Sequence, residues 1–293
     1  MEITDFAKGS MWGMPGDRFD ILYRKFIEYQ ANADLIKLAV TGADNQDEED
    51  YRIIDRVAVI PISGLITKNA SFWSWLFPGS SITGITELLQ TAITDPKVDA
   101  ILLNIDSPGG TVNGTNALSE AIFEARNEKP IIAYASMMAS AAYWIGCGAN
   151  YVFADKTADI GSIGVLMVHT EYSKHYENEG VKTTYLTAGK YKAIGNDSEP
   201  LSELAKETFR KELDYVYGIF IDTVAKNRGV AADFVKNNMA DGRIFIGEQA
   251  VTAGLVDMVA SIDDALWYAK QIAKKKQLLT AGGLSSWKGV SNV

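Results

Sequence analysis

The chain has 293 residues, 47% of them hydrophobic, and a net charge of −9 from 28 basic and 37 acidic side chains. This length and composition suit one large buried core with terminal extensions, and the acidic balance argues against binding to nucleic acid or anionic membranes. The single cysteine, Cys147, excludes an intramolecular disulfide, and its apolar surroundings favour a small buried side chain over a reactive thiol.

Along the chain, the pattern predicts three regions. Residues 1–50 form an N-terminal extension, with a helix over 17–37 and a solvated acidic linker over 43–50. Residues 51–279 form the main domain, and residues 280–293, rich in glycine and serine, form a flexible tail.

Within the main domain, short apolar runs alternate with helical patterns, which is typical of an α/β fold. The apolar runs predict buried strands at 57–63, 100–106, 130–135, 151–153 and 163–168, and a strand-like segment at 183–186. The helical patterns predict helices at 82–94, 113–127, 170–179, 201–227, 231–238, 247–253 and 262–276, and directly after Ser140.

No charged residue occurs over 130–154, a length that is also compatible with a membrane span. The stretch opens on Pro130 and contains serine, glycine and asparagine, so a strand, a helix and a second strand in one core explain it better. We therefore expect no stable membrane insertion. Without a secretory signal pattern at the start of the sequence, we also expect a cytoplasmic protein.

An aromatic loop over 72–78 includes Trp73 and Trp75. It has two interpretations of equal weight. It could be an apolar cluster packed under a loop, or a wall of the substrate site or a subunit contact, because so much aromatic area rarely stays in water.

Ser140 and Lys192 are the candidate catalytic pair. Ser140 lies between a predicted strand and an alanine-rich helical segment, where backbone N–H groups are free. Lys192 follows Gly189 in a predicted turn. A serine becomes a good nucleophile when a base takes its proton, and a desolvated neutral lysine can be that base. Burial must then lower the lysine pKa by roughly 3 units.

The segment Ser107-Pro108-Gly109-Gly110 predicts a turn after the strand at 100–106. Glycine allows positive φ and close backbone approach, so the amides of such a turn can point into a cleft. We expect the amides of Gly110 and Ala141 to form an oxyanion hole. Taken alone, each of these residues has an ordinary interpretation: a turn, a small helical serine and a solvated lysine.

Four motifs together resemble the signal peptide peptidase A family, and most closely its phage head-maturation branch. Their order and spacing match that family over about 56–259. The motifs are Asp-Ser-Pro-Gly-Gly at 106–110, Ala-Ser-Ala-Ala-Tyr at 139–143, Gly-Ser-Ile-Gly-Val at 161–165 and Gly-Lys-Tyr-Lys at 189–192.

The resemblance implies a ClpP/crotonase-like spiral of ββα units and a serine endopeptidase. It makes Ser140 the nucleophile, Lys192 rather than Lys190 the general base, and Ser162 the residue that holds the lysine. Gly109 is also expected to contact substrate, as are Trp73 and Trp75 under the interpretation of the aromatic loop as a wall of the substrate site. Many cellular members have Ser-Gly-Gly at the nucleophile where this chain has Ser140-Ala141-Ala142, which narrows the pocket slightly.

The resemblance also implies a homo-oligomeric ring in which neighbouring subunits complete the active site. Protein or peptide substrates are expected, with capsid, scaffold or portal proteins as partners and no metal or cofactor. The protein would work in the host cytoplasm or the phage prohead.

Several alternatives remain open at this point. A Ser–His–Asp triad would have to use His169 or His175, the two histidines of the chain. A crotonase-type acyl-CoA enzyme would need carboxylates placed near the oxyanion hole, and none borders Ser140. A cellular signal-peptide-peptidase-like protease or a catalytically silent capsid-assembly component would use the same fold.

Overall fold

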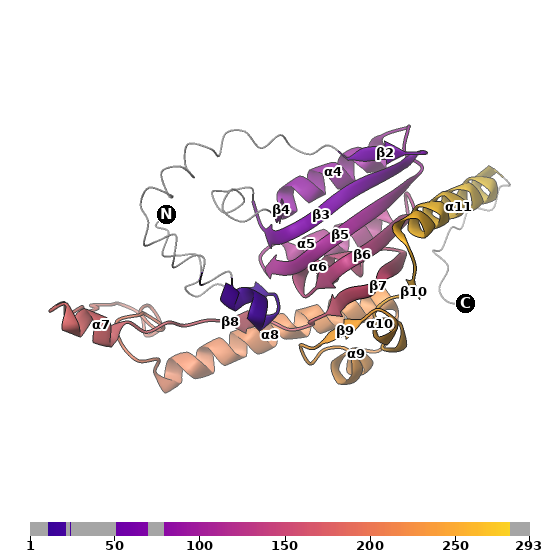
Figure 1. The fold of residues 1–293 in the computed structure, drawn as a ribbon. Coiled ribbons are helices and arrows are strands. Elements are labelled where there is room, and N and C mark those ends of the chain that lie inside the picture. The colour runs from indigo at the N-terminus through magenta and orange to yellow at the C-terminus, as the bar shows by residue number, and fades with distance from the viewer. Residues whose placement is uncertain (1–10, 22–23, 25–50, 70–78, 282–293) are drawn as a thin grey trace.

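A largely parallel, ten-stranded sheet organises the described part of the chain (Figure 1). The computed structural model describes residues 11–21, 24, 51–69 and 79–281. The centre of the sheet consists of four parallel strands in spatial order: β3 (Val57–Thr67), β5 (Ala100–Thr111), β6 (Ile131–Ala139) and β7 (Tyr151–Gly161). Two short strands extend it in parallel: β4 (Gly79–Ser81) beside β3 and β10 (Met258–Val259) beside β7.

Four short antiparallel strands complete the sheet. β2 (Arg52–Ile54) pairs with β3, and β9 (Ile244–Ile246) pairs with β7. β1 (Met11–Gly13) lies between the end of β5 and β8 (Leu166–Met167). The sequence pattern did not predict β1, β2, β4, β9 or β10.

Helices cover both faces of the sheet, which explains why its central strands are apolar on both sides. One face packs against α4 (Ile82–Thr94), α5 (Thr115–Ala125), α6 (Ala141–Gly146) and the C-terminal part of α8 (Glu203–Arg228). The other face packs against α11 (Ile262–Ala281). Alternation along the strands divides them accordingly, so that Ile101 and Leu103 face the first layer and Leu102 faces the second.

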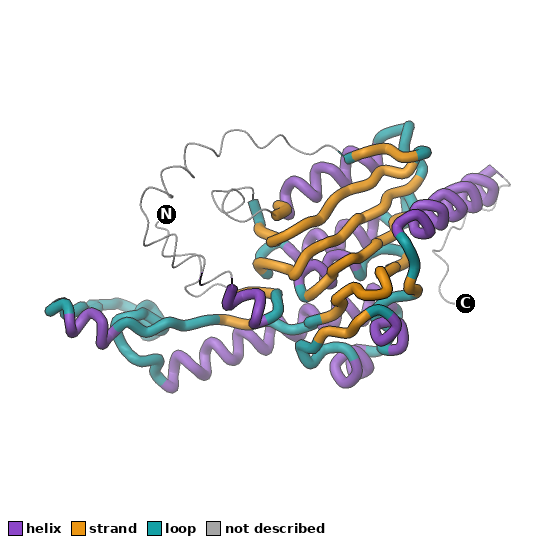
Figure 2. The backbone as a smooth tube through the Cα atoms, viewed as in Figure 1, coloured by secondary structure: helices purple, strands orange, loops and turns teal. Residues whose placement is uncertain are grey.

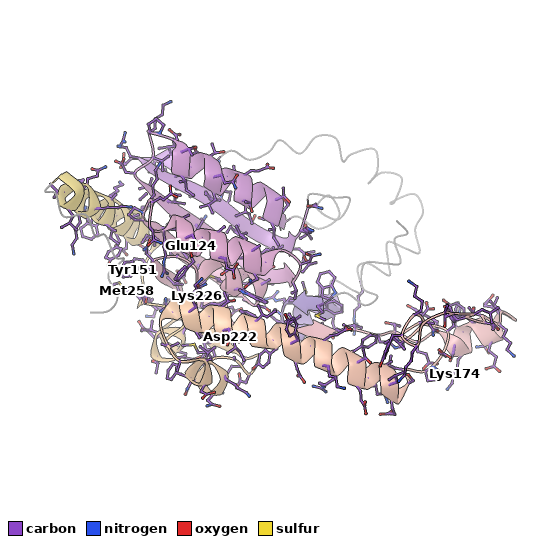
Figure 3. All side chains as sticks on the ribbon, turned by 180° about the vertical axis from the view of Figure 1, so that it is seen from behind. Glu124, Tyr151, Lys174, Asp222, Lys226 and Met258 are labelled. Carbon is purple, nitrogen blue, oxygen red and sulfur yellow. The ribbon has the colours of Figure 1, made fainter. Side chains whose placement is uncertain are left out.

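The segment between β8 and the part of α8 that packs on the core from Val216 onward forms an arm that projects from the sheet (Figures 1 and 2). The arm contains α7 (Ser173–Asn178) and the N-terminal part of α8, and Lys174 lies near its far end (Figure 3). The rest of α8 is anchored, because Phe220 stacks on Trp144 with ring centroids 4.1 Å apart. α9 (Ala232–Asn238) and α10 (Glu248–Thr252) follow α8 and lie near β9, next to the β7 edge of the sheet (Figure 1).

The predicted α/β class is confirmed, and the predicted helix at 82–94 has the same bounds as α4. The predicted buried strand at 163–168 is reduced to the short, half-buried β8 at Leu166–Met167. Two further local predictions are wrong. Residues 107–110 belong to β5, because β3 runs alongside and pairs Leu65 with Gly109 and Ile66 with Gly110. Residues 183–186 form no strand.

The uncharged stretch at 130–154 divides into β6, α6 and the start of β7, as predicted. Among the helices that the structure describes, none combines the length and hydrophobicity that a bilayer crossing requires. The acidic linker, the aromatic loop and nearly all of the tail lie outside the described residues, as does most of the predicted helix at 17–37.

Candidate active site

Ser140 occupies a strained junction between β6 and α6. Its φ of 52° and ψ of −115° are unusual for a residue with a side chain. The backbone is held there because the Ser140 amide donates to the Gly161 carbonyl at 2.7 Å. The Oγ donates to the Gly164 carbonyl at 3.3 Å, and the residue is fully buried. A strained strand-to-helix turn is a recurrent way to present a nucleophilic serine.

The end of β5 lies directly against the start of α6. A Cβ atom added to Gly109, which has φ of 103°, would lie 3.0 Å from the Ala141 amide nitrogen and 2.9 Å from the Ala139 carbonyl oxygen. Ser107 holds the backbone at Gly109 in this conformation, because the Ser107 Oγ donates to the Gly64 carbonyl at 2.6 Å and accepts from the Gly109 amide at 3.1 Å. The structure thus brings the Gly109–Gly110 segment to the residues that follow β6.

Ser162 lies at the neighbouring strand end. It also has a positive φ, 50°, and its amide donates to the Arg243 carbonyl at 2.8 Å. β6 and β7 align Ala139 with Gly161. Ser140 directly follows Ala139 and Ser162 directly follows Gly161, so the two serines with positive φ lie at neighbouring strand ends. Ser162 is buried, with 5% of its surface exposed.

Lys192 lies apart from these residues in the single chain. It is an exposed residue of the arm, in a turn where its amide donates to the Gly189 carbonyl at 3.1 Å. Among the described hydrogen bonds, the Oγ of Ser140 reaches Gly164 and not Lys192. The sequence predicts a buried Lys192 beside Ser140, and a single subunit does not place the lysine there.

Both histidines also belong to the arm or its base. The Nε2 of His169 is 2.9 Å from the Asn196 carbonyl oxygen, and His175 is exposed on α7. These positions give no support to a Ser–His–Asp triad. Within the described ranges, no cluster of histidine, cysteine and acidic side chains is arranged to hold a metal ion.

The helix behind Ser140 is packed in a dry interior. Burial raises the pKa of the Cys147 thiol to about 11, and it also raises the pKa of Tyr143 above its ordinary value. The Tyr143 hydroxyl donates to the Leu255 carbonyl at 2.9 Å. The prediction that Cys147 is a small buried side chain is confirmed. α6 therefore serves as a rigid support for the serine.

Sequence reasoning missed β1, which reaches this site from the N-terminal region. Gly13 of β1 is aligned with Gly110, and a Cβ atom on Gly13 would lie 3.2 Å from the Ser140 Oγ. A three-residue strand has no periodicity to detect, so the pattern at 11–13 carried no signal. Trp73 and Trp75, predicted to contact substrate, lie outside the described residues.

Comparison with known proteins adds a consistent set of relatives. A family model described as peptidase family S49 matches residues 124–277. The chain is 31% identical over 255 residues to the capsid assembly protease C of Escherichia phage lambda, covering 85% of this chain and 57% of that protein. It is 32% identical to the head-tail preconnector protein GP5 of Enterobacteria phage P21, covering 74% of this chain and 43% of that protein.

A cellular relative is the putative signal peptide peptidase SppA of Enterococcus faecium, 31% identical over 67% of this chain and 59% of that protein. The chain thus spans about half the length of these relatives. A solved structure, a mutant of the 1510-N membrane-bound stomatin-specific protease, has a TM-score of 0.43 and 16% identity, covering 73% of this chain and 84% of that chain.

Proposed function

Because the chain belongs to peptidase family S49, we propose that it is a serine endopeptidase that acts in phage capsid maturation. The observation that carries the proposal is the strained, buried Ser140 beside the Ala141 amide and the Gly109–Gly110 segment. The relatives named as a capsid assembly protease and a head-tail preconnector protein support a role in the prohead. Capsid, scaffold or portal proteins would be its substrates.

The proposed reaction is acyl transfer to Ser140. Lys192 takes the proton of the Ser140 hydroxyl as the Oγ attacks the scissile carbonyl. The amides of Gly110 and Ala141 donate to the oxyanion, and each such donor typically contributes about 3 kcal/mol to transition-state stabilisation. Lys192 then gives the proton to the leaving amine, and water hydrolyses the acyl-enzyme. Ser162 would hold the lysine ammonium in place between these steps.

The exposed position of Lys192 is reconciled with this chemistry if the arm docks on a second copy of the chain. The arm exposes several large apolar side chains, including Leu186 at 95% and Tyr215 at 73%. Apolar side chains gathered on a projection are typical of a protein contact. We infer that the arm brings Lys192 to Ser140 of a neighbouring subunit, where the lysine side chain is taken out of water. The family resemblance, which implies a homo-oligomeric ring and a ClpP/crotonase-like spiral, agrees with this arrangement.

Mass spectrometry of an unfolded protein substrate tests the catalytic assignment. We expect cleavage by wild type and no cleavage by Ser140→Ala or Lys192→Ala. Lys190→Ala is the matched control, because Lys190 is an equally exposed lysine two residues away and should retain activity. Activity in Lys192→Ala, or its loss in Lys190→Ala, would contradict the assignment of the base. A wild type that cleaves nothing would favour a silent assembly component.

A further inference from the structure

β1 is an extended strand that lies between two other strands of the sheet, close to Ser140. It pairs antiparallel with β5 on one side, where Trp12 is aligned with Thr111 and Gly13 with Gly110. It pairs antiparallel with β8 on the other side, where Trp12 is aligned with Leu166. The two flanking strands bear or adjoin the motifs that we assign to the active site. Adding a strand between exposed edges is a common way to bind an extended peptide.

Gly13 is the residue of β1 that reaches the nucleophile. A Cβ atom on Gly13 would lie 3.2 Å from both the Ser140 Oγ and the Ala141 amide nitrogen. A Cβ atom on Gly109 would lie 2.1 Å from the Gly13 carbonyl oxygen, so that carbonyl passes directly over the Gly109 backbone.

The ladder register points to the same carbonyl. The Val112 amide donates to the Met11 carbonyl at 3.3 Å. Hydrogen-bonded pairs alternate along an antiparallel ladder, so we expect Gly13 and Gly110 to form the next such pair. The Gly13 carbonyl would then face the Gly110 amide, one of the two assigned oxyanion donors.

The residues around Gly13 hold the strand in place. Trp12 is 1% exposed and packs edge-on against Phe19, with ring centroids 5.5 Å apart. Met14 is 4% exposed. The Phe19 amide donates to the Pro15 carbonyl at 2.9 Å, which begins a helical turn directly after the strand. Met11–Gly13 is an extended strand, and the chain leaves the extended conformation just beyond Gly13.

We propose that Met11–Gly13 is an internal substrate strand and that Ser140 of the same chain cuts the Gly13–Met14 bond, an inference that rests on the proposed peptidase function. Lys192 takes the proton of the Ser140 hydroxyl as the Oγ bonds to the Gly13 carbonyl carbon; the bond to the Met14 nitrogen then breaks, and that nitrogen takes the proton from Lys192. Water then hydrolyses the Gly13 ester, which leaves a carboxylate on Gly13, a free amine on Met14 and a restored Ser140 hydroxyl.

This placement also defines a substrate class. A Cβ atom on Gly13 is already in tight contact with Ser140 and Ala141, so a residue larger than alanine before the cut bond forces the strand out of the site. Other substrates should likewise be extended peptides with glycine or alanine before the cut bond. Until it is cut or displaced, β1 excludes them from Ser140.

The test measures the intact mass of the full chain together with cleavage of an unfolded protein, for wild type, Ser140→Ala, Gly13→Val and Gly16→Val. We expect wild type to begin at Met14 and Ser140→Ala to stay whole. Gly13→Val should stay whole and still cleave the unfolded protein. Gly16→Val is the matched control, because a Cβ atom there meets nothing within 4 Å, and it should be cut like wild type.

The outcomes separate the two proposals. If wild type and Gly16→Val cleave the unfolded protein but keep the Gly13–Met14 bond, the internal-substrate proposal fails and the peptidase proposal stands. If neither wild type nor Gly13→Val cleaves the unfolded protein, the peptidase proposal itself fails. Ser140→Ala chains mixed with wild type should remain whole, since each strand lies in its own site, and their cleavage at Gly13–Met14 would overturn the intramolecular assignment.

Discussion

At the scale of single residues, the site depends on backbone positions that admit little variation. Ser140 and Ser162 both have positive φ, although neither is glycine, and Gly109 lies where a Cβ atom would meet three backbone atoms within 3.0 Å. The sequence predicted that Ser140, Ala141 and Gly110 would share one site, and in the structure the backbone of Gly109 lies against Ala141; the catalytic roles of these residues stay predictions. The sequence could not predict that Lys192 would be exposed, because that depends on contacts beyond the single chain.

Gly110 gives a residue-scale prediction about stability. A Cβ atom there would lie 1.8 Å from the Ile66 carbonyl oxygen of β3. We expect Gly110→Ala to force β3 and β5 apart. The free energy of unfolding should fall by about 1–3 kcal/mol. Urea unfolding followed by circular dichroism measures this.

Gly218→Ala in α8 is the matched control for Gly110→Ala. Nothing lies within 4 Å of its added Cβ atom, and alanine favours a helix over glycine. Gly218→Ala should leave stability unchanged or raise it by up to about 1 kcal/mol. Equal losses in the two variants would contradict the assigned packing at Gly110.

At the scale of elements, predictability followed the length and hydrophobicity of each segment. Helices with a clear apolar face, such as 82–94, were predicted with little error. The four central strands begin within one residue of the predicted positions, but each continues four to eight residues beyond its predicted end. The short strands β1, β2, β4, β9 and β10 have two or three residues each, and distant neighbours in the fold determine their pairing. Pro108-Gly109-Gly110 was interpreted as a turn because local preference gives no information about β3 alongside it.

The contact between Arg56 and Asp99, next to the starts of β3 and β5, gives an element-scale prediction about pH. The Arg56 side chain donates from Nε to Asp99 at 2.5 Å and from a terminal nitrogen at 2.7 Å, which joins the start of β3 to the residue before β5. These hydrogen bonds lower the pKa of Asp99 below its usual value of 3.8. A carboxyl with a lowered folded-state pKa stabilises the fold above its unfolded pKa, and that contribution is lost as pH falls through the folded-state value.

We therefore expect wild type to have a higher urea midpoint than Asp99→Asn at pH 7. The difference should shrink as the pH falls below about 4. Asp155→Asn is a useful control, since Asp155 is hydrogen-bonded locally to Thr157 and joins no two strands. A difference between wild type and Asp99→Asn that is the same at pH 7 and pH 3 would show that the Arg56–Asp99 charge pair is not its source.

At the scale of the whole molecule, the chain consists of a two-sided α/β core and an arm that leaves it. The anchor is well defined, because α8 is fixed to the core by the stacking of Phe220 on Trp144 and lies beside α5, where Lys226 is 4.0 Å from Glu124 (Figure 3). The sequence predicted the helix at 201–227 but gave no sign that half of it would project. That property depends on the absence of core neighbours along the arm, which local patterns do not encode.

The central claim is that Ser140 of one subunit works with Lys192 of another. It is tested most directly by mixing Ser140→Ala and Lys192→Ala proteins under conditions that allow subunits to exchange, and measuring cleavage of an unfolded protein. Each variant alone should be inactive. The mixture should regain activity at up to about a quarter of its sites, because random assortment pairs an intact serine with an intact lysine from the neighbour. A mixture that stays inactive, although its subunits exchange and wild type is active, would contradict the shared site.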